Sequence, residues 1–143
     1  MNNKEAELIK KYNINLELLK NEQLKLAKTL SIKDSRDFSD INLIAGIDSE
    51  VSGSEILSIT VVIDQERNIV EQVYSTGKMK FPYITGFRSY RELPTMLDSF
   101  SKLEEKPDVV FIKGHGISHP RLGLASHFSL SSAVPTIGVA ESL

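Results

Sequence analysis

From residue 41 onwards, short apolar segments are separated first by tight turns and then by helical segments, and this order leaves few possible folds. Three β-branched runs joined by short polar turns predict an antiparallel meander: 41–48, 55–64 and 69–75. Two later apolar runs, 109–112 and 136–139, follow segments of helical periodicity at 89–105 and 122–130. Because strands reached through helical crossovers lie parallel in a sheet, the sequence predicts an α/β fold with a mixed sheet.

The first 40 residues have a different character. Residues 4–30 carry apolar side chains at helical spacing among Lys and Glu, which predicts an amphipathic helix. Asn13 and Asn15 favour a turn or a cap, so two helices with a break at 12–15 are the alternative. The Ser- and Asp-rich segment 31–40 indicates a linker. We therefore divide the chain into an N-terminal helical segment, 1–36, and one domain, 37–143.

Bulk composition limits the class of protein. The chain has 143 residues, 41% hydrophobic and 25% charged, as in ordinary globular domains. No apolar run reaches the ~18 residues that a membrane helix needs, and the first residues lack the apolar stretch of a secretory signal. Together with the absence of cysteine, which excludes disulfides, thiolate zinc sites and cysteine nucleophiles, this predicts a cytoplasmic protein without a membrane partner.

The net charge of −2 argues against a protein that coats nucleic acid through net charge alone. A local basic strip nevertheless carries four cations and no acid before Glu92: Lys78, Lys80, Arg88 and Arg91. The strip is consistent with a solvated face or with a phosphate-binding surface.

Two carboxylates and three histidines are candidates for chemistry. Asp48 ends a buried strand and Glu92 lies in the first turn of the helix expected from Ser89, so both have structural interpretations, as a turn former and as a helix cap. Two hard oxygen ligands from separate elements are also what Mg²⁺ requires for phosphodiester hydrolysis. A zinc site is disfavoured, because glycines and Pro120 argue against a helix that would align the rings of His115 and His119. We expect His115, His119 and His127 to be hydrogen-bonding loop histidines instead.

Three stretches together resemble the endonuclease V family. They are IAGID at 44–48, FPYITGFRSYRELP at 81–94, and a region from 107 to 140 that contains GHGISHPRLGLASH at 114–127 and PTIGVA at 135–140. The resemblance covers most of 41–143. It implies a ribonuclease H-like fold, dependence on Mg²⁺ or Mn²⁺, and hydrolysis of the second phosphodiester 3′ to a deaminated adenine in DNA or, for some members, RNA. The implied partner is inosine-containing nucleic acid, with a homodimer as a further possibility.

The same resemblance implies roles for individual residues. Asp48 and Glu92 match the metal-binding catalytic carboxylates. Pro82, Tyr83 and Ile84 match the wedge that separates the strands, and a glycine-rich set matches the pocket for the flipped base: Gly86, Gly114, Gly123 and Leu124. Further nucleic-acid contacts are expected from Thr85, Arg88, His119 and Arg121.

The chain departs from the family pattern at several positions. Lys113 stands where the family has a metal-binding Asp, Glu141 stands where it has a Lys, and Thr85 replaces a wedge proline. One residue is missing between Arg121 and Leu122, and the sequence ends before the family's further strands and its catalytic His. A fixed ammonium beside Asp48 opposes binding of a divalent ion. Glu50 could replace the lost ligand if the strand continues past Asp48.

These features lead to three hypotheses. The first is a deoxyinosine-directed nuclease with impaired or lost activity, and the second is a metal-free binding or interaction module on the same fold. The third is a fragment with no role. On any of them we expect Asp48, Glu92 and Lys113 to converge. We also expect one face of the sheet to be open, so that it drives self-association or is covered by the leucines of 8–30.

Overall fold

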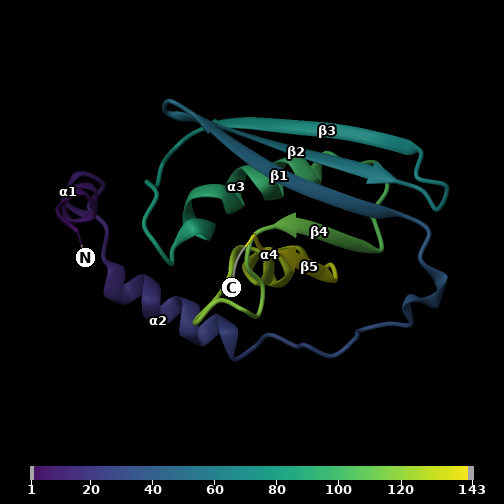
Figure 1. Cartoon of the computed structure of the whole chain (residues 1–143), viewed down its shortest axis with the longest axis horizontal. Helices are drawn as coiled ribbons and strands as arrows, with labels where there is room; N and C mark the ends of the chain where they lie inside the picture. The colour runs from purple at the N-terminus through teal and green to yellow at the C-terminus, as the bar shows by residue number, and fades with distance from the viewer. Residues whose placement is uncertain (1, 142–143) are drawn as a thin grey trace.

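The computed structural model describes residues 2–141 and contains a five-stranded mixed sheet with two helices packed on one face (Figure 1). The first three strands are β1 (Ile44–Ser52), β2 (Glu55–Ile63) and β3 (Ile69–Lys78). They form the expected antiparallel meander. β4 (Val109–Lys113) and β5 (Thr136–Val139) complete the sheet in the order β3-β2-β1-β4-β5, with β4 parallel to β1 and β5 parallel to β4. This arrangement agrees with the α/β architecture predicted from the sequence.

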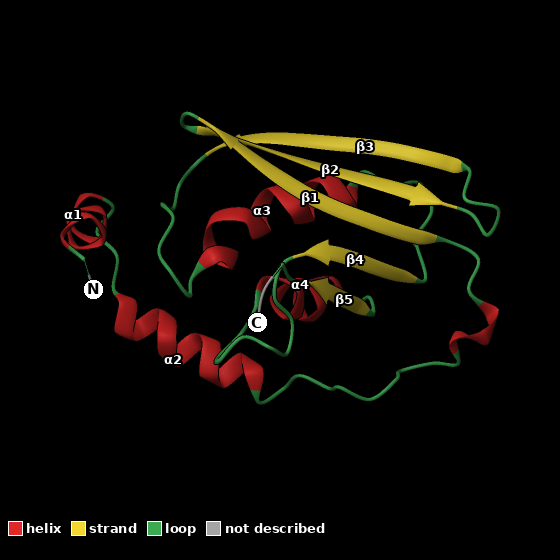
Figure 2. Ribbon diagram, viewed as in Figure 1, coloured by secondary structure: helices red, strands yellow, loops and turns green. Residues whose placement is uncertain are grey.

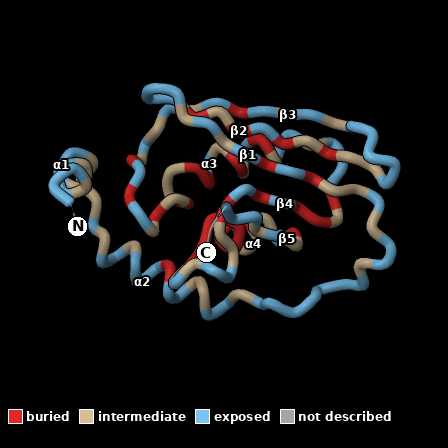
Figure 3. Tube along the Cα trace, in the orientation of Figure 1, coloured by how far each residue is buried: buried red, intermediate tan, exposed pale blue. Residues whose placement is uncertain are grey.

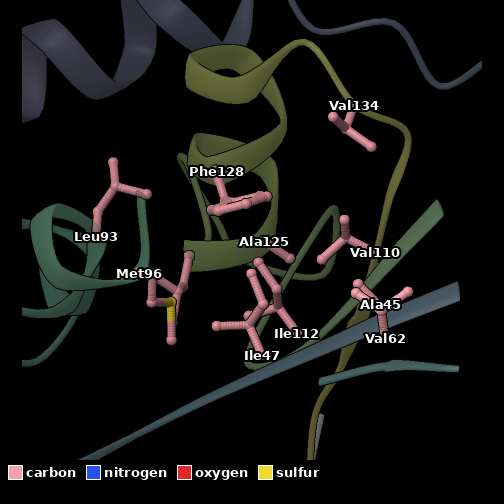
Figure 4. Close-up of a cluster of buried hydrophobic side chains, with 11 residues drawn as sticks. Ala45, Ile47, Val62, Leu93, Met96, Val110, Ile112, Ala125, Phe128 and Val134 are labelled. Atoms are coloured by element: carbon pink, nitrogen blue, oxygen red, sulfur yellow. The ribbon is translucent and has the colours of Figure 1, made fainter. Parts of the chain in front are cut away.

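Helix α3 (Arg88–Ser101) leads into β4, and helix α4 (Leu124–Ser132) leads into β5. Both pack on the same face, where Met96 of α3 and Phe128 of α4 meet Ile47 and Ile112 of the central strands (Figure 4). These four side chains are at most 3% exposed. Burial of this apolar face supplies the main driving force that holds the helices on the sheet.

The N-terminal segment forms two helices, not one. Helix α1 (Asn3–Lys11) and helix α2 (Leu16–Ala27) are separated at the expected break, where Asn13 adopts a positive φ of 51° and the Asn15 side chain accepts from Leu18 N. Figure 2 shows both helices at the end of the molecule that carries the loop before α3. The linker includes a short 3-10 helix (Phe38–Asp40), and Asp108 ties it to the domain through an ion pair with Arg36.

Several expected boundaries were wrong by a few residues. β1 begins and ends later than predicted and β3 runs on to Lys78, because cross-strand pairing with β2 continues through polar residues that carry no apolar signal. The helix expected over 89–105 ends at Ser101, and Pro94 lies within it on the exposed side, beyond the first turn. The helix expected over 122–130 starts and ends two residues later.

The opposite face of the sheet is open, as expected. Alternation along the strands directs five apolar side chains that are 37–63% exposed to this face: Ile59, Tyr74, Phe111, Ile137 and Val139. The N-terminal helices do not cover it, because α2 packs against α4 and the loop before α3 (Figure 3). Cover of this face by the leucines of 8–30 of the same chain, one of the two alternatives expected, was therefore wrong, since polar contacts hold α2 elsewhere. We call this surface the open face.

Candidate functional site: the ends of β1 and β4

Asp48 and Lys113 are neighbours at the carboxyl ends of two parallel strands. Ile47 of β1 pairs with Ile112 of β4, so the next residue on each strand is Asp48 and Lys113. Both are exposed, and the Asp48 carboxylate accepts a hydrogen bond from Ser49 N at 2.8 Å. The adjacency predicted for these two residues is confirmed.

β1 continues without interruption to Ser52, so Asp48 and Glu50 point to the same face of the strand. Ala45 and Ile47, with the other parity, lie in the core. The two carboxylates therefore belong to the open face, whereas α3, which carries Glu92, covers the other.

Glu92 is held by two arginines. It is 2% exposed and lies in the second turn of α3, not in the first turn as the sequence suggested. Its Oε2 accepts from Arg88 Nε at 2.5 Å, its Oε1 accepts from Arg88 Nη2 at 3.0 Å, and Arg91 Nη2 approaches Oε2 at 3.3 Å. Such a bidentate pair is the strong form of a charge-assisted hydrogen bond, and it raises the pKa of Arg88 above its usual value. Both oxygens of Glu92 are therefore engaged.

Lys113 has a partner of its own. Its Nζ lies 3.1 Å from Glu141 Oε1, just beyond the end of β5. This bond, reinforced by the nearby charge of Asp48, raises the pKa of Lys113. Lys113 and Glu141 are both departures from the pattern that the family resemblance implies, with the sign of the charge reversed at each position. The structure shows that the two departures form one ion pair.

These residues do not fit Mg²⁺ or Mn²⁺. Within 2–141 no group of three or more Asp, Glu or His residues is close enough to hold a metal ion. The chemistry of the donors agrees, because Glu92 is engaged by two guanidinium groups and the Lys113 ammonium stands beside Asp48. Fixed positive charges next to these carboxylates repel a divalent cation. Glu50 has the orientation required of a replacement ligand but does not complete a group of three.

The loop expected to act as a wedge lies between β3 and α3. Pro82 and Ile84 are buried, so they anchor the loop, while Tyr83 is 54% exposed and Arg91 lies 5.0 Å from the centre of its ring. Thr85 is exposed and donates from its hydroxyl to Glu5 Oε1 of α1 at 3.1 Å. Of the residues matched to the wedge, Tyr83 and Thr85 project from the surface.

Helix α2 fixes this loop through a buried glutamine that the sequence reasoning missed. Gln23 is fully buried, donates to Gly86 O at 2.9 Å and accepts from Arg121 Nε at 2.7 Å. Arg121 also donates to Gly86 O and lies 4.9 Å from the centre of the Phe87 ring. A signal was present in the sequence, because Gln23 falls on the apolar stripe of α2 between Leu19 and Leu26.

The residues expected to form a base pocket are packed against their neighbours. Leu124 is 3% exposed and belongs to the core. A side chain on Gly123 would collide with the carbonyl of His115, and one on Gly86 would come within 2.6 Å of the Arg121 guanidinium. These glycines allow close packing of the loops. Gly114 borders a surface hollow of about 310 Å³, which Arg88 and Lys113 also line.

Two of the three histidines act as hydrogen-bonding side chains, His119 in a loop as predicted and His127 in helix α4 instead of a loop. His127 is buried, shares a hydrogen bond of 2.9 Å between Nδ1 and Ser89 Oγ, and has its pKa lowered by burial. His119 accepts from Arg121 N through Nδ1, and burial together with the charge of Arg121 lowers its pKa. His115 lines the hollow.

The chain matches one protein family over most of its length. The family model described as Endonuclease V matches residues 24–143, which is most of the chain. The chain belongs to the endonuclease V family. The match begins within α2, so this helix is partly inside the family region and α1 is outside it.

Solved structures of endonuclease V are similar over most of this chain. The catalytic domain of human endonuclease V is 29% identical, with a TM-score of 0.82 over 90% of this chain, and the Bacillus subtilis protein is 30% identical, with 0.81 over 92%. The Ciona intestinalis endonuclease V, solved with a 24mer DNA containing an inosine followed by a ribo-adenosine, is 26% identical with a TM-score of 0.84 over 90%. The chain spans only 58–59% of the length of these three structures.

No helix within residues 2–141 is long and apolar enough to cross a membrane.

Proposed function

We propose that the protein recognises inosine-containing nucleic acid in the manner of endonuclease V, and that hydrolysis of the second phosphodiester 3′ to the inosine is impaired in this chain. The observation that carries the proposal is the anchored loop before α3. There an exposed Tyr83 is supported by Arg91 on a segment fixed by Gln23 and by the buried Pro82 and Ile84.

The exposed aromatic ring of this loop can stack on an unpaired base or fill the gap that a flipped base leaves in a duplex. Stacking of a base on an aromatic side chain contributes about 1–3 kcal/mol and needs no particular sequence. Arg91 keeps the Tyr83 ring in place, which lowers the entropy cost of binding. An enzyme or binder that reads hypoxanthine must expose its edge, and a ring that fills the gap compensates for the lost stacking.

The arrangement at the ends of β1 and β4 supports impaired hydrolysis. Divalent-metal catalysis of phosphodiester cleavage needs oxygen ligands free to bind the ion. Here Glu92 is paired with Arg88 and Arg91, and Lys113 is paired with Glu141. The same pairs favour the second candidate function, a metal-free binding module.

Binding and nicking measured together test the proposal. We expect the protein to bind a labelled oligonucleotide with one deoxyinosine more tightly than the matched deoxyadenosine strand, in EDTA, by fluorescence anisotropy. Tyr83→Ala should weaken inosine binding by about 5- to 150-fold, the equivalent of one stacked base. Tyr74→Ala is the matched control, since Tyr74 is 63% exposed, against 54% for Tyr83, but lies on the open face.

A nicking assay with Mn²⁺ on the same strands separates the two candidate functions. Absence of nicking with retained inosine preference supports the binding module. Efficient nicking by the unmodified chain would contradict the impaired site, and equal affinity for both strands would contradict inosine recognition.

A further inference from the structure

The surface hollow at the ends of β4 and β5 places two cations around an accessible space. Arg88 and Lys113 line it, together with Gly114, His115 and the segment 139–141. Its volume of about 310 Å³ is roughly ten times the ~30 Å³ that a water molecule occupies in the liquid. The hollow is thus large enough for a group such as a phosphate.

Arg88 reaches this hollow while still paired with Glu92. Its Nε and Nη2 bind the carboxylate, and its Nη1 lies 3.3 Å from the point where a Cβ on Gly114 would stand. Because Gly114 has no side chain, the guanidinium can pack closely against its backbone beside Leu124 while it lines the hollow. The pair with Glu92 fixes the orientation of the guanidinium, so little of its freedom is lost when an anion binds.

In the unbound protein, Lys113 is paired with the exposed carboxylate of Glu141, which can move away. Glu141 is 80% exposed and contacts Lys113 through one oxygen. An exposed ion pair of this kind contributes little stability. A phosphate, with more charge and more acceptor oxygens, can take the place of the carboxylate.

The balance of charge favours this exchange. The charged side chains that line the hollow are Arg88, Lys113 and Glu141. When Glu141 moves away, the two cations of the lining remain, with Arg88 still paired with Glu92. The hollow then attracts an anion without any metal ion.

We infer that Arg88 and Lys113 form a metal-independent site for a phosphate of the nucleic-acid backbone, with Glu141 as the displaceable carboxylate of the unbound state. The inference rests on the proposed function, since it assigns a backbone contact to the same surface. It also gives a physical reason for the reversed charges at 113 and 141, which preserve an ion pair while replacing an oxygen ligand by a phosphate-binding ammonium.

The test uses a fluorescent single strand without inosine, in EDTA, at several salt concentrations. We expect Lys113→Ala to weaken binding by about three- to tenfold and to reduce the slope of log affinity against log salt by about 0.7, the value for one lost phosphate contact on a single strand. Glu141→Gln should tighten binding by up to about fivefold, because a competing exposed ion pair is removed. Lys113→Arg should restore most of the affinity.

Lys106→Ala is the matched control, because Lys106 is exposed and precedes β4 at the opposite end of the strand from Lys113. Equal effects of Lys113→Ala and Lys106→Ala, weaker binding by Glu141→Gln, a requirement for added Mn²⁺, or no binding of the single strand would each overturn the inference. Inosine preference is measured separately, so a protein that keeps that preference while Lys113→Ala has no effect would refute only the phosphate site. Clear effects at 113 and 141 without inosine preference would refute only the proposed function.

Discussion

Lys113 decides the chemistry available at the ends of β1 and β4. An oxygen ligand at this position would stand beside Asp48 on the neighbouring strand. The ammonium that stands there instead pairs with Glu141. In the proposed site, this one side chain replaces a potential oxygen ligand by an ammonium.

We predict that Lys113→Asp binds Mn²⁺ more tightly than the unmodified protein in isothermal calorimetry. The substitution removes a positive charge and adds a hard oxygen ligand next to Asp48. The gain should be roughly tenfold or more, because even supporting groups around metal ligands change affinity by 10–100-fold. Lys106→Asp, which makes the same change in net charge far from Asp48, should have no effect. Strong Mn²⁺ binding by the unmodified chain would show that Glu50 or another acid already completes a site.

Because His127 is buried, we predict that the folded protein loses stability in mild acid. Burial lowers its pKa in the folded protein below the value of about 6.5 in the unfolded chain. Between these two values the unfolded state binds more protons, so stability is full above about pH 6.5 and falls as the pH decreases, by at most about 1.4 kcal/mol per pH unit. The nearby charge of Glu22 opposes this effect in part.

Urea unfolding at pH 7.5 and pH 5.5 measures this dependence. His127→Asn keeps a polar atom near Ser89 Oγ and removes the titrating ring, so its stability should change less between the two pH values. The pKa of His119 is also lowered, so His119 supplies part of the pH dependence that remains in the variant. An identical pH dependence in the protein and in His127→Asn would show that His127 does not contribute.

At the scale of elements, α2 acts as a brace for the loop before α3. Gln23 is the only buried residue of the helix, and it reaches both Gly86 O and Arg121. Tyr90 adds a second link from α3, since its hydroxyl donates to Glu22 Oε1 at 2.8 Å. The loop is therefore positioned by a helix some 60 residues away in sequence, and not by its own turns alone.

We predict that Gln23→Ala destabilises the protein by about 1–3 kcal/mol, because the part-buried Arg121 Nε loses its acceptor and Gly86 O loses one of its two donors. Hydrogen exchange of the amides at 83–86 should become faster to a greater extent than exchange in β1. Asn21→Ala, an exposed position on the same helix, should be close to neutral. Unchanged exchange in the loop of the Gln23 variant would show that α2 does not hold it.

At the scale of the whole molecule, the open face exposes apolar side chains that no helix of the described residues covers. Sheets that include parallel strands are ordinarily covered on both sides. Here α3 and α4 cover one side only, and Ile59, Phe111 and Ile137 are exposed on the other. Several exposed apolar side chains on one face mark an interaction site or an aggregation risk.

We predict that the chain self-associates through the open face, as a dimer or larger species in light scattering. Ile59→Lys combined with Ile137→Lys should shift the protein to monomer, because two charges on the interface must otherwise be desolvated. Leu18→Lys is the control, since Leu18 is 61% exposed but lies on α2. A monomer at all concentrations for the unmodified chain would refute the prediction.

The local pattern of the sequence determined the elements and their order. Period-2 and period-3.6 apolar spacing predicted the meander, both crossover helices and β5 at 136–139, because side-chain alternation is a property of short segments. The adjacency of Asp48 and Lys113 also followed, since neighbouring parallel strands bring their carboxyl ends to the same edge of the sheet. The family resemblance predicted the overall architecture.

Only the tertiary structure decided how charges and polar groups pair. The partners of Lys113 and Gln23 come from segments distant in the sequence, Glu141 beyond β5 and the loop residues Gly86 and Arg121. The Arg88–Glu92 pair differs, because its i,i+4 spacing within α3 is already visible in the sequence. No local pattern encodes the contacts of Lys113 and Gln23, because they depend on where distant segments meet after the core has formed. The same applies to the open face, since the leucines of the N-terminal segment could have covered it. Polar contacts of Gln23 with Gly86 and Arg121 hold α2 against the loop instead.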